Sequence, residues 1–310
     1  MVDKIVIGTR GSELARAQTR MVEEALREKW PDVTIETKII RTSGDESHPR
    51  AGNLRHGRKG LFTAEIEKAL LARDVDLAVH SAKDLPSETN PSAEIGAVLP
   101  RAPMDDVLVA KQPGGLTSLR ESATIATGSV RRKHQLAWKH PGLAIIELRG
   151  NVPTRLRKLA ASDWDAIVLA SAGLERLGFS TTRAQINFEG RQFFIEVLPR
   201  EIFLPAGGQG IIALQIRADN ESIRAIVEPV NNRETLLCLR AEREFLRLLQ
   251  GDCNSPVGVL ATTKDGIMKM RAQVFQDGSG APRAGRAEGR CDDCEHLALE
   301  LLRQINGEQD

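Results

Sequence analysis

The sequence around residue 80 reads Val75-Asp76-Leu77-Ala78-Val79-His80-Ser81-Ala82-Lys83-Asp84. Residues 75–79 form a short, mostly apolar run with the length and composition of a buried β-strand. The run ends in a polar turn, residues 80–84, in which a lysine stands beside an aspartate. Ligands of open α/β sheets bind outside the carboxyl ends of the strands, so this turn is a candidate binding site.

Strands and helices alternate on the amino-terminal side of this segment. We expect a strand at Lys4–Ile7, a helix whose apolar face carries Leu14, Ala17, Met21 and Ala25, a strand at Val33–Ile40 and a helix near Phe62–Leu70. The polar segment Arg41–Gly60 lies between the last two elements, and its length is typical of a mobile lid or of a disordered segment. Such alternation is typical of a mostly parallel sheet.

The same alternation restarts after Pro100–Pro103 and gives way to a different pattern near the end. We expect strands at Val107–Ala110, Thr124–Ala126, Leu143–Leu148 and Ala166–Ala170, and a strand at Ile211–Ile216 that could return to the first sheet. A helix from Asn232 to Leu248, short strands near 257–262 and 269–275 and a last helix near 295–304 follow. The predicted fold class is therefore α/β, with two α/β domains, residues 1–99 with 199–218 and residues 104–196, and a small α+β domain, residues 221–310. The hinges are expected at 99–103 and 197–200.

The composition is that of a folded protein with no strongly basic surface. Of 310 residues, 41% are hydrophobic and 27% are charged, and 43 basic against 42 acidic side chains leave a formal charge of +1. The charge therefore argues against a general nucleic-acid binder. The basic residues comprise 31 Arg and 12 Lys. Arg forms bidentate pairs with carboxylate or phosphate, so the excess hints at anion recognition, although surface solubility is the simpler explanation of the count alone.

The sequence also bears on location and assembly. No stretch approaches the roughly 18 consecutive apolar residues of a membrane-spanning helix, and Met1–Ile7 lacks a basic segment followed by an apolar one. We expect a cytoplasmic protein with no membrane or nucleic-acid partner. The even charge and sparse aromatic residues give no reason to expect an obligate interface, so a monomer is predicted.

Five polar clusters, each with Arg or Lys, follow predicted strands. They are Thr9-Arg10-Gly11-Ser12, Ser81-Ala82-Lys83-Asp84, Thr127-Gly128-Ser129-Val130-Arg131-Arg132, Arg149-Gly150-Asn151-Val152-Pro153-Thr154-Arg155, and Ala170-Ser171-Ala172-Gly173 with Arg176. Strand ends and helix starts meet at one edge of such sheets and attract anions. We therefore expect an anion-lined cleft between the two α/β domains, with Arg131 and Arg132 pointing into it. Asp84 is the lone carboxylate of these clusters, where it either pairs with a cation or stabilises a cationic substrate.

The four cysteines differ in their surroundings. Cys253 follows the long helix in a Gly-Asp-Cys-Asn-Ser-Pro turn, which would expose its thiol. Cys238 falls inside the helix and is expected in the core. Cys291 and Cys294 have zinc-like spacing, but no second Cys or His pair completes four ligands, so no metal is predicted and a metal site there is only an alternative.

Seven blocks, taken in order, resemble the porphobilinogen deaminase family, also called hydroxymethylbilane synthases. The blocks are Ile7-Gly8-Thr9-Arg10, Lys59-Gly60-Leu61-Phe62, Val79-His80-Ser81-Ala82-Lys83-Asp84-Leu85-Pro86, Arg131-Arg132, Leu148-Arg149-Gly150-Asn151-Val152, Pro205-Ala206-Gly207-Gly208-Gln209-Gly210 and Gly251-Asp252-Cys253. Any one block is weak, but the ordered set covers nearly the whole chain. Ala64 departs from the pattern, since many relatives have a lysine there. The resemblance implies two domains like the halves of a periplasmic binding protein and a third that carries a cofactor cysteine.

The resemblance also implies the reaction and the residues that carry it. Cys253 would hold a dipyrromethane cofactor through a thioether. The enzyme, a transferase of tetrapyrrole and haem biosynthesis, would join four porphobilinogen molecules head to tail, release ammonia at each addition and hydrolyse off a linear hydroxymethylbilane. The residues expected at the cofactor are Ser12, Lys83, Asp84, Ser129, Arg131, Arg132 and Arg155, and those expected at the substrate are Arg10, Arg149 and Arg176. Asp84 would be the central catalytic residue, because a fixed carboxylate stabilises the cationic ring left when ammonia departs.

One alternative comes from a different class of protein. A non-catalytic solute-binding protein has the same two-lobed architecture. The expected third domain with a loop cysteine argues against it.

Overall fold

The first sheet combines strands from both ends of the amino-terminal two thirds of the chain. The computed structural model describes residues 2–42, 63–88, 90–250, 255–276 and 280–308. Its first sheet has the order β2-β1-β3-β11-β4, with β1 Lys4–Thr9, β2 Thr34–Ile39, β3 Leu77–Ser81, β4 Ala93–Val98 and β11 Ile212–Arg217. Strand β1 pairs in parallel with β2 and β3, whereas β11 runs antiparallel between β3 and β4. The return of the strand predicted at 211–216 to the first sheet is therefore confirmed.

Three helices accompany the first sheet. They are α1 Glu13–Lys29, α2 Ala64–Leu71 and α6 Glu221–Val227. Helix α1 buries Val22 and Leu26 against Ile5 and Ile7 of β1. Burial of one apolar helix face on a sheet is what stabilises such a layer. The segment predicted as a lid or a disordered segment, residues 41–60, falls almost wholly outside the described residues.

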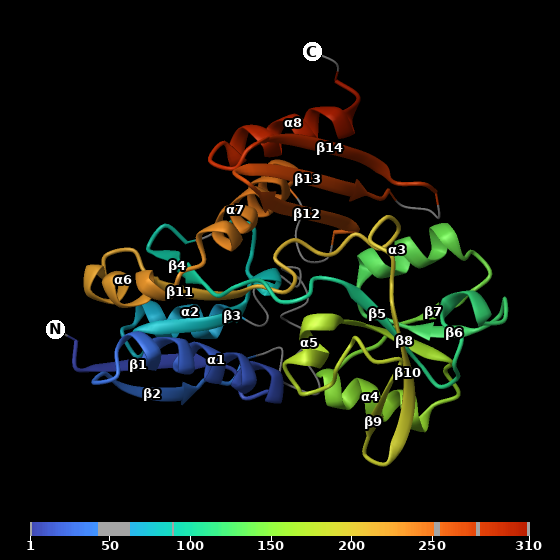
Figure 1. Ribbon diagram of the computed structural model, residues 1–310, viewed down its shortest axis with the longest axis horizontal. Coiled ribbons are helices and arrows are strands. Elements are labelled where there is room, and N and C mark those ends of the chain that lie inside the picture. The colour runs from blue at the N-terminus through green and yellow to red at the C-terminus, as the bar shows by residue number, and fades with distance from the viewer. Residues whose placement is uncertain (1, 43–62, 89, 251–254, 277–279, 309–310) are drawn as a thin grey trace.

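The second sheet lies on the right in Figure 1, drawn mostly in green and yellow. Its order is β7-β6-β8-β5-β10-β9, with β5 Asp106–Ala110, β6 Thr124–Ala126, β7 Ala144–Ile146, β8 Ala166–Ala170, β9 Gln185–Phe188 and β10 Arg191–Val197. Helices α3 Val130–Lys139, α4 Val152–Ala161 and α5 Ser171–Glu175 follow β6, β7 and β8. Strands β5 and β8 are fully or almost fully buried along most of their length, as expected for a sheet covered on both faces.

The third unit is an antiparallel sheet covered by two helices. Strands β12 Val257–Lys264, β13 Ile267–Val274 and β14 Arg283–Arg290 pair in that order, and α7 Arg233–Leu248 and α8 Cys294–Asn306 pack on them. Their shared core includes Phe245, Met270 and Leu301. The chain thus has the predicted class, two α/β domains and a small α+β domain. No helix in the described ranges is long and apolar enough to cross a membrane.

One loop, Leu204–Gly210, contacts all three units where they meet (Figure 1). The backbone oxygen of Pro205 accepts from the amide of Val259 on β12, at 2.9 Å, and that of Gly210 accepts from the amide of Ala102, at 3.0 Å. The oxygen of Leu204 accepts from the Arg131 guanidinium of the second domain, at 2.8 Å. This junction loop, as we call Leu204–Gly210, thereby fixes where the third unit sits relative to the other two.

Candidate active site

The turn after β3 is a short 3₁₀ helix, Ala82–Asp84, which presents Lys83 and Asp84 side by side. It is anchored by the Ala82 amide, which donates to the Ile211 oxygen at 3.0 Å. The junction loop passes directly against it. Gly208 has a φ of +76°, and a Cβ there would lie 2.9 Å from the backbone nitrogen of Lys83. Glycine is therefore required at 208 for both the backbone conformation and the close approach.

Lys83 lies in the electrostatic field of both α/β domains. Burial lowers the pKa of its ammonium to about 8, opposed by the charge of Asp84 and assisted by that of Arg132. Because a buried cation with too little compensating charge favours anionic ligands, this lysine is suited to hold a carboxylate. The structure thus brings together Lys83 and Asp84 of the first domain with Arg132 of the second.

Arg131 and Arg132 are buried and share one carboxylate. Nη1 of Arg131 and Nη2 of Arg132 each donate to the carboxylate of Asp106, at 2.7 Å, and Asp106 is fully buried. Burial alone would raise the pKa of the Asp106 carboxyl, but the charges of Arg131 and Arg132 outweigh it and hold that pKa well below its usual range. The Nε atoms of both arginines have no partner within the described ranges.

This geometry corrects two expectations. The two guanidinium groups do not simply project into a cleft, because Nη1 of Arg131 donates to Asp106, Gln135 and the Leu204 oxygen, and Arg132 donates to Asp106 and the Val168 oxygen. Asp84 is also not the lone carboxylate of the basic neighbourhood, since Asp106 occupies its centre. In the sequence, Asp106 directly precedes the buried strand predicted at Val107–Ala110. A carboxylate buried at that position requires a buried cationic partner.

Asp106→Asn is expected to lower the free energy of unfolding by about 3–5 kcal/mol, because it leaves two buried guanidinium groups without their carboxylate. Urea denaturation at neutral pH measures this loss. Asp105→Asn is the matched control, since the neighbouring carboxylate pairs with Arg200, whose side chain is 42% exposed. A midpoint for Asp106→Asn as high as that of the control contradicts the prediction.

Ser12 and Ser129 both cap helices at the edges of the two sheets. The Ser12 hydroxyl accepts from the Ala15 amide at 3.2 Å, and that of Ser129 accepts from the Arg132 amide at 3.4 Å. Both are half-buried. Caps of this kind satisfy free amides at a helix start and leave the hydroxyl hydrogen available to a ligand.

The four remaining arginines of the predicted site differ in their freedom. Burial lowers the pKa of Arg155 to about 10, with Arg132 adding to and Asp84 opposing that effect, so Arg155 lies near Asp84. Burial likewise lowers the pKa of Arg176 to about 10, and its Nη2 donates to the Gly210 oxygen at 2.7 Å. Arg149 instead pairs with Glu147 at 2.8 Å with its side chain 58% exposed. Arg10 is half-buried, and its charge contributes to keeping the pKa of His80 low.

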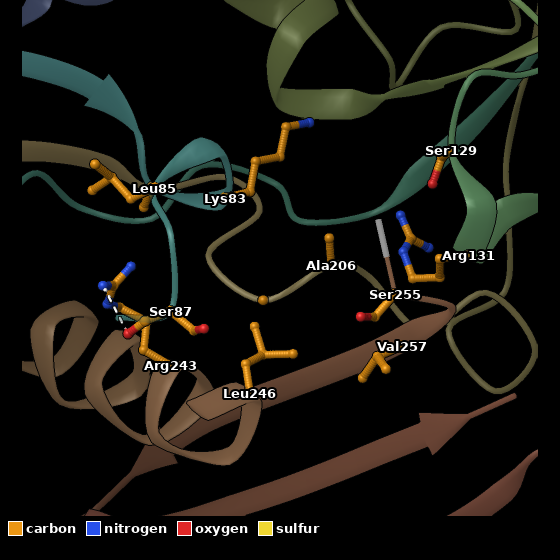
Figure 2. A pocket seen from close by; sticks show the side chains of 12 residues that line it. Lys83, Leu85, Ser87, Ser129, Arg131, Ala206, Arg243, Leu246, Ser255 and Val257 are labelled. Atoms are coloured by element: carbon orange, nitrogen blue, oxygen red, sulfur yellow. Dashed lines mark hydrogen bonds between the residues drawn. The ribbon is translucent and has the colours of Figure 1, made fainter. Parts of the chain in front are cut away.

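A cavity lies where the three units meet (Figure 2). Lys83 lines it from the first domain, Ser129 and Arg131 from the second, and Arg243 and Ser255 from the third. Cys253 lies outside the described residues, two positions before Ser255. Of the residues that the structure describes, Ser255 is the nearest in sequence to Cys253, and it lines this cavity.

The residues present fit a dipyrromethane group. Each of its two rings carries an acetate and a propionate, so the group brings four carboxylates. Lys83 and Arg155 are half-buried cations whose pKa is lowered by burial more than the charge of Asp84 raises it, and within the described ranges the buried Nε atoms of Arg131 and Arg132 have no partner. Charge-assisted hydrogen bonds from such groups to carboxylates are strong.

The other cysteines occupy the third domain. Cys238 and Cys294 are buried and Cys291 is half-buried, and all three are free thiols. Across the described ranges, no three His, Cys, Asp or Glu side chains form a group that could hold a metal ion.

Comparisons with known proteins agree with this site. A family model described as "Porphobilinogen deaminase, dipyromethane cofactor binding domain" matches residues 5–225, and one described as "Porphobilinogen deaminase, C-terminal domain" matches residues 236–307. The curated protein named porphobilinogen deaminase from Moorella thermoacetica is 41% identical, across 98% of this chain and 95% of the relative. That from Chlorobium phaeobacteroides is 37% identical with the same two coverages.

A solved structure gives a more distant likeness. The methionine-binding protein MetQ superposes with a TM-score of 0.43 at 12% identity, covering 76% of this chain and 92% of that chain. Two family models match most of the chain, and curated relatives are similar over nearly its whole length. The chain therefore belongs to the porphobilinogen deaminase family.

Proposed function

We propose that this site joins four porphobilinogen molecules head to tail and releases a linear hydroxymethylbilane. Each addition breaks the carbon–nitrogen bond of one aminomethyl group, forms one carbon–carbon bond and releases one ammonia. Water then cleaves the finished chain from the enzyme. The observation that carries this proposal is the cavity at the junction of three domains, lined by Lys83, Arg131 and Ser255, the last of which stands two positions after Cys253 in the sequence. The family membership supports the same chemistry.

The cofactor is proposed to be held by residues of all three domains. Cys253 would bind it covalently, and Ser12, Lys83, Asp84, Ser129, Arg131, Arg132 and Arg155 would contact it. When bound, dipyrromethane supplies the carbon nucleophile on which the chain begins. The arginine and lysine side chains would orient the cofactor through its carboxylates. Holding it in one orientation lowers the entropic cost of bringing it together with the substrate.

Asp84 is proposed as the catalytic residue. Its carboxylate would accept the pyrrole N–H of the substrate and stabilise the positive charge that the ring acquires as ammonia leaves. The charge of Asp84 raises the pKa of both Lys83 and Arg155, so the Asp84 carboxylate lies within electrostatic range of these two cations.

Arg10, Arg149 and Arg176 are proposed to bind the carboxylates of incoming substrate. Arg149 is paired with Glu147 on the surface, and an exposed pair of this kind is exchanged for a ligand at little cost. The bidentate geometry of arginine suits the acetate and propionate of each ring.

Lys83 is expected to make cofactor assembly pH-dependent. Its pKa of about 8 means that the ammonium loses its proton as the pH rises through 8, and an uncharged amine no longer attracts carboxylates. In protein produced without cofactor, the gain of two pyrrole units from porphobilinogen should slow above pH 8. Lys83→Arg keeps its charge over this range and should not slow. Time courses of intact mass measure both, and superimposable pH profiles would refute the role of Lys83.

The domain limits and the setting of the enzyme complete the proposal. We expect three domains, formed by residues 1–99 with 199–218, by 104–196 and by 221–310. They would move about hinges at 99–103 and 197–200. The enzyme is expected to be a cytoplasmic monomer. Small-angle scattering and gel filtration, with and without porphobilinogen, measure the motion and the assembly.

The experiment that tests the function is the stoichiometry of the reaction. Purified protein is incubated with porphobilinogen, and ammonia, porphobilinogen and linear tetrapyrrole are quantified together. We expect one ammonia per porphobilinogen consumed and one tetrapyrrole per four. Binding of porphobilinogen without release of ammonia would instead identify a non-catalytic two-lobed binding protein.

A further inference from the structure

Helix α7 reaches the Lys83–Asp84 turn with two consecutive side chains. Glu242 is fully buried, and its two carboxylate oxygens accept from the amides of Gly208, at 2.6 Å, and Ala261, at 2.8 Å. Arg101 of the first hinge segment donates to the same carboxylate at 2.6 Å. Glu242 thereby fixes Gly208, the residue that packs against the Lys83 nitrogen.

Arg243, the next residue of α7, holds the other side of the turn. Its Nη2 donates to the backbone oxygens of Pro86, at 2.6 Å, and Ser87, at 3.3 Å. Figure 2 shows the side chain reaching from α7 to Ser87. These two carbonyls belong to the residues two and three positions after Asp84, so the contact restrains the chain as it leaves the turn.

Arg243 is half-buried, and within the described ranges its guanidinium pairs with backbone oxygens and with no carboxylate. Burial is the sole cause that lowers the pKa of its guanidinium to about 10, so no carboxylate offsets the desolvation. Burying a cation to bind two carbonyls of a loop is unfavourable unless the loop position matters. A surface ion pair, such as that of Arg247 with Glu244 one turn later, costs far less.

The helix also leads to the cofactor loop. Helix α7 ends at Leu248, five residues before Cys253. A contact from α7 to the chain after Asp84 therefore couples the proposed attachment point to the proposed catalytic carboxylate. The two residues otherwise belong to different domains.

We propose that Arg243 is a positioning residue, which holds the turn bearing Asp84 at a fixed place relative to the loop of Cys253. The inference rests on the roles proposed above for those two residues. Arg243 also lines the cavity with Lys83, but its hydrogen bonds go to the main chain of residues 86–87, and its role is exerted through them. Its loss should therefore slow the chemical step without weakening substrate binding, since small displacements of a reacting group reduce rate far more than affinity.

The test compares Arg243→Met with Arg247→Met in the cofactor-bearing enzyme. Both remove a guanidinium from the same helix, but only the first breaks the contact with residues 86–87. For Arg243→Met we expect the dipyrromethane mass to be retained, kcat to fall about 10–100-fold and KM for porphobilinogen to change by less than about two-fold. Arg247→Met should match wild type. Arg243→Lys, which keeps a cationic donor, should recover part of kcat.

Three outcomes overturn the proposal. One is a kcat for Arg243→Met equal to that of Arg247→Met, and a second is a raised KM at unchanged kcat, which would make Arg243 a substrate-binding residue. The third is failure of Arg243→Lys to recover any activity in a folded, loaded enzyme. If Arg243→Met does not fold or load, Arg243→Gln, which is too short to span the contact, is judged by the same criteria. A wild-type protein that releases no ammonia refutes the proposed function, and only an active wild type makes the comparison informative.

Discussion

Asp84→Asn is expected to lower kcat for porphobilinogen by about 10²–10³-fold, the usual cost of removing one preorganised electrostatic group. The amide has nearly the shape of the carboxylate and can still accept a pyrrole N–H. What it lacks is the charge that stabilises the ring as ammonia leaves. Because the side chain is only half-buried and the substitution keeps its size, the variant should fold.

Two measurements separate slow chemistry from other defects. Intact mass gives the fraction of each preparation that carries two pyrrole units, and kcat is expressed per loaded enzyme. Asp219→Asn serves as the control, since this aspartate is 63% exposed and pairs with Arg73 on the surface of the same domain. Ammonia release by loaded Asp84→Asn at the rate of the control would rule out Asp84 as the catalytic residue.

The sequence predicted both strands with an uninterrupted apolar run and the alternating strand at Val33–Ile40, which the structure contains as β2. Val107–Ala110 and Ala166–Ala170 are covered on both faces, so nearly every side chain is apolar and the run is visible. Strand β14, Arg283–Arg290, escaped prediction because it contains four arginines or glutamates and buries only Ala287. It forms because its backbone pairs with β13 along eight residues at an open edge.

The positions of the site residues along the chain were predictable, but their partners were not. A polar cluster after a strand indicates a ligand edge in any open α/β sheet, and this places Lys83, Asp84 and Ser129 without knowledge of tertiary structure. Asp106 and Gln209 lie 103 residues apart and are joined by a 2.8 Å hydrogen bond. Local periodicity carries no information about such a pair.

The buried network at the junction loop illustrates the same limit. Arg101 and Glu242 come from segments 141 residues apart, and their pairing depends on how the third domain docks. In the sequence, Glu242 lies on a helix rich in charge and resembles a solvated residue. Its full burial follows only from the docking of α7 against the hinge and β12.

Cys253→Ser is expected to yield a folded protein that never carries the dipyrromethane. A thioether forms when the sulfur attacks the methylene carbon of porphobilinogen, with the carbon–nitrogen bond breaking and ammonia leaving. A serine hydroxyl is far less nucleophilic than a thiolate at neutral pH. Denatured intact mass should therefore show the excess of two pyrrole units in wild type and no excess in the variant, before and after incubation with porphobilinogen.

The remaining thiols make the choice of cysteine testable. Burial raises the pKa of Cys238 to about 11 and also raises the pKa of Cys294, so both are poor nucleophiles at neutral pH. Cys291 is half-buried and free, which makes Cys291→Ser the matched control, expected to keep the full excess mass. Retention of the adduct in Cys253→Ser, or its loss in Cys291→Ser, would move the attachment point. Cys253 stands two positions before Ser255, which lines the cavity together with Lys83, whereas Cys291 packs against the core of the third domain, three positions before α8 begins.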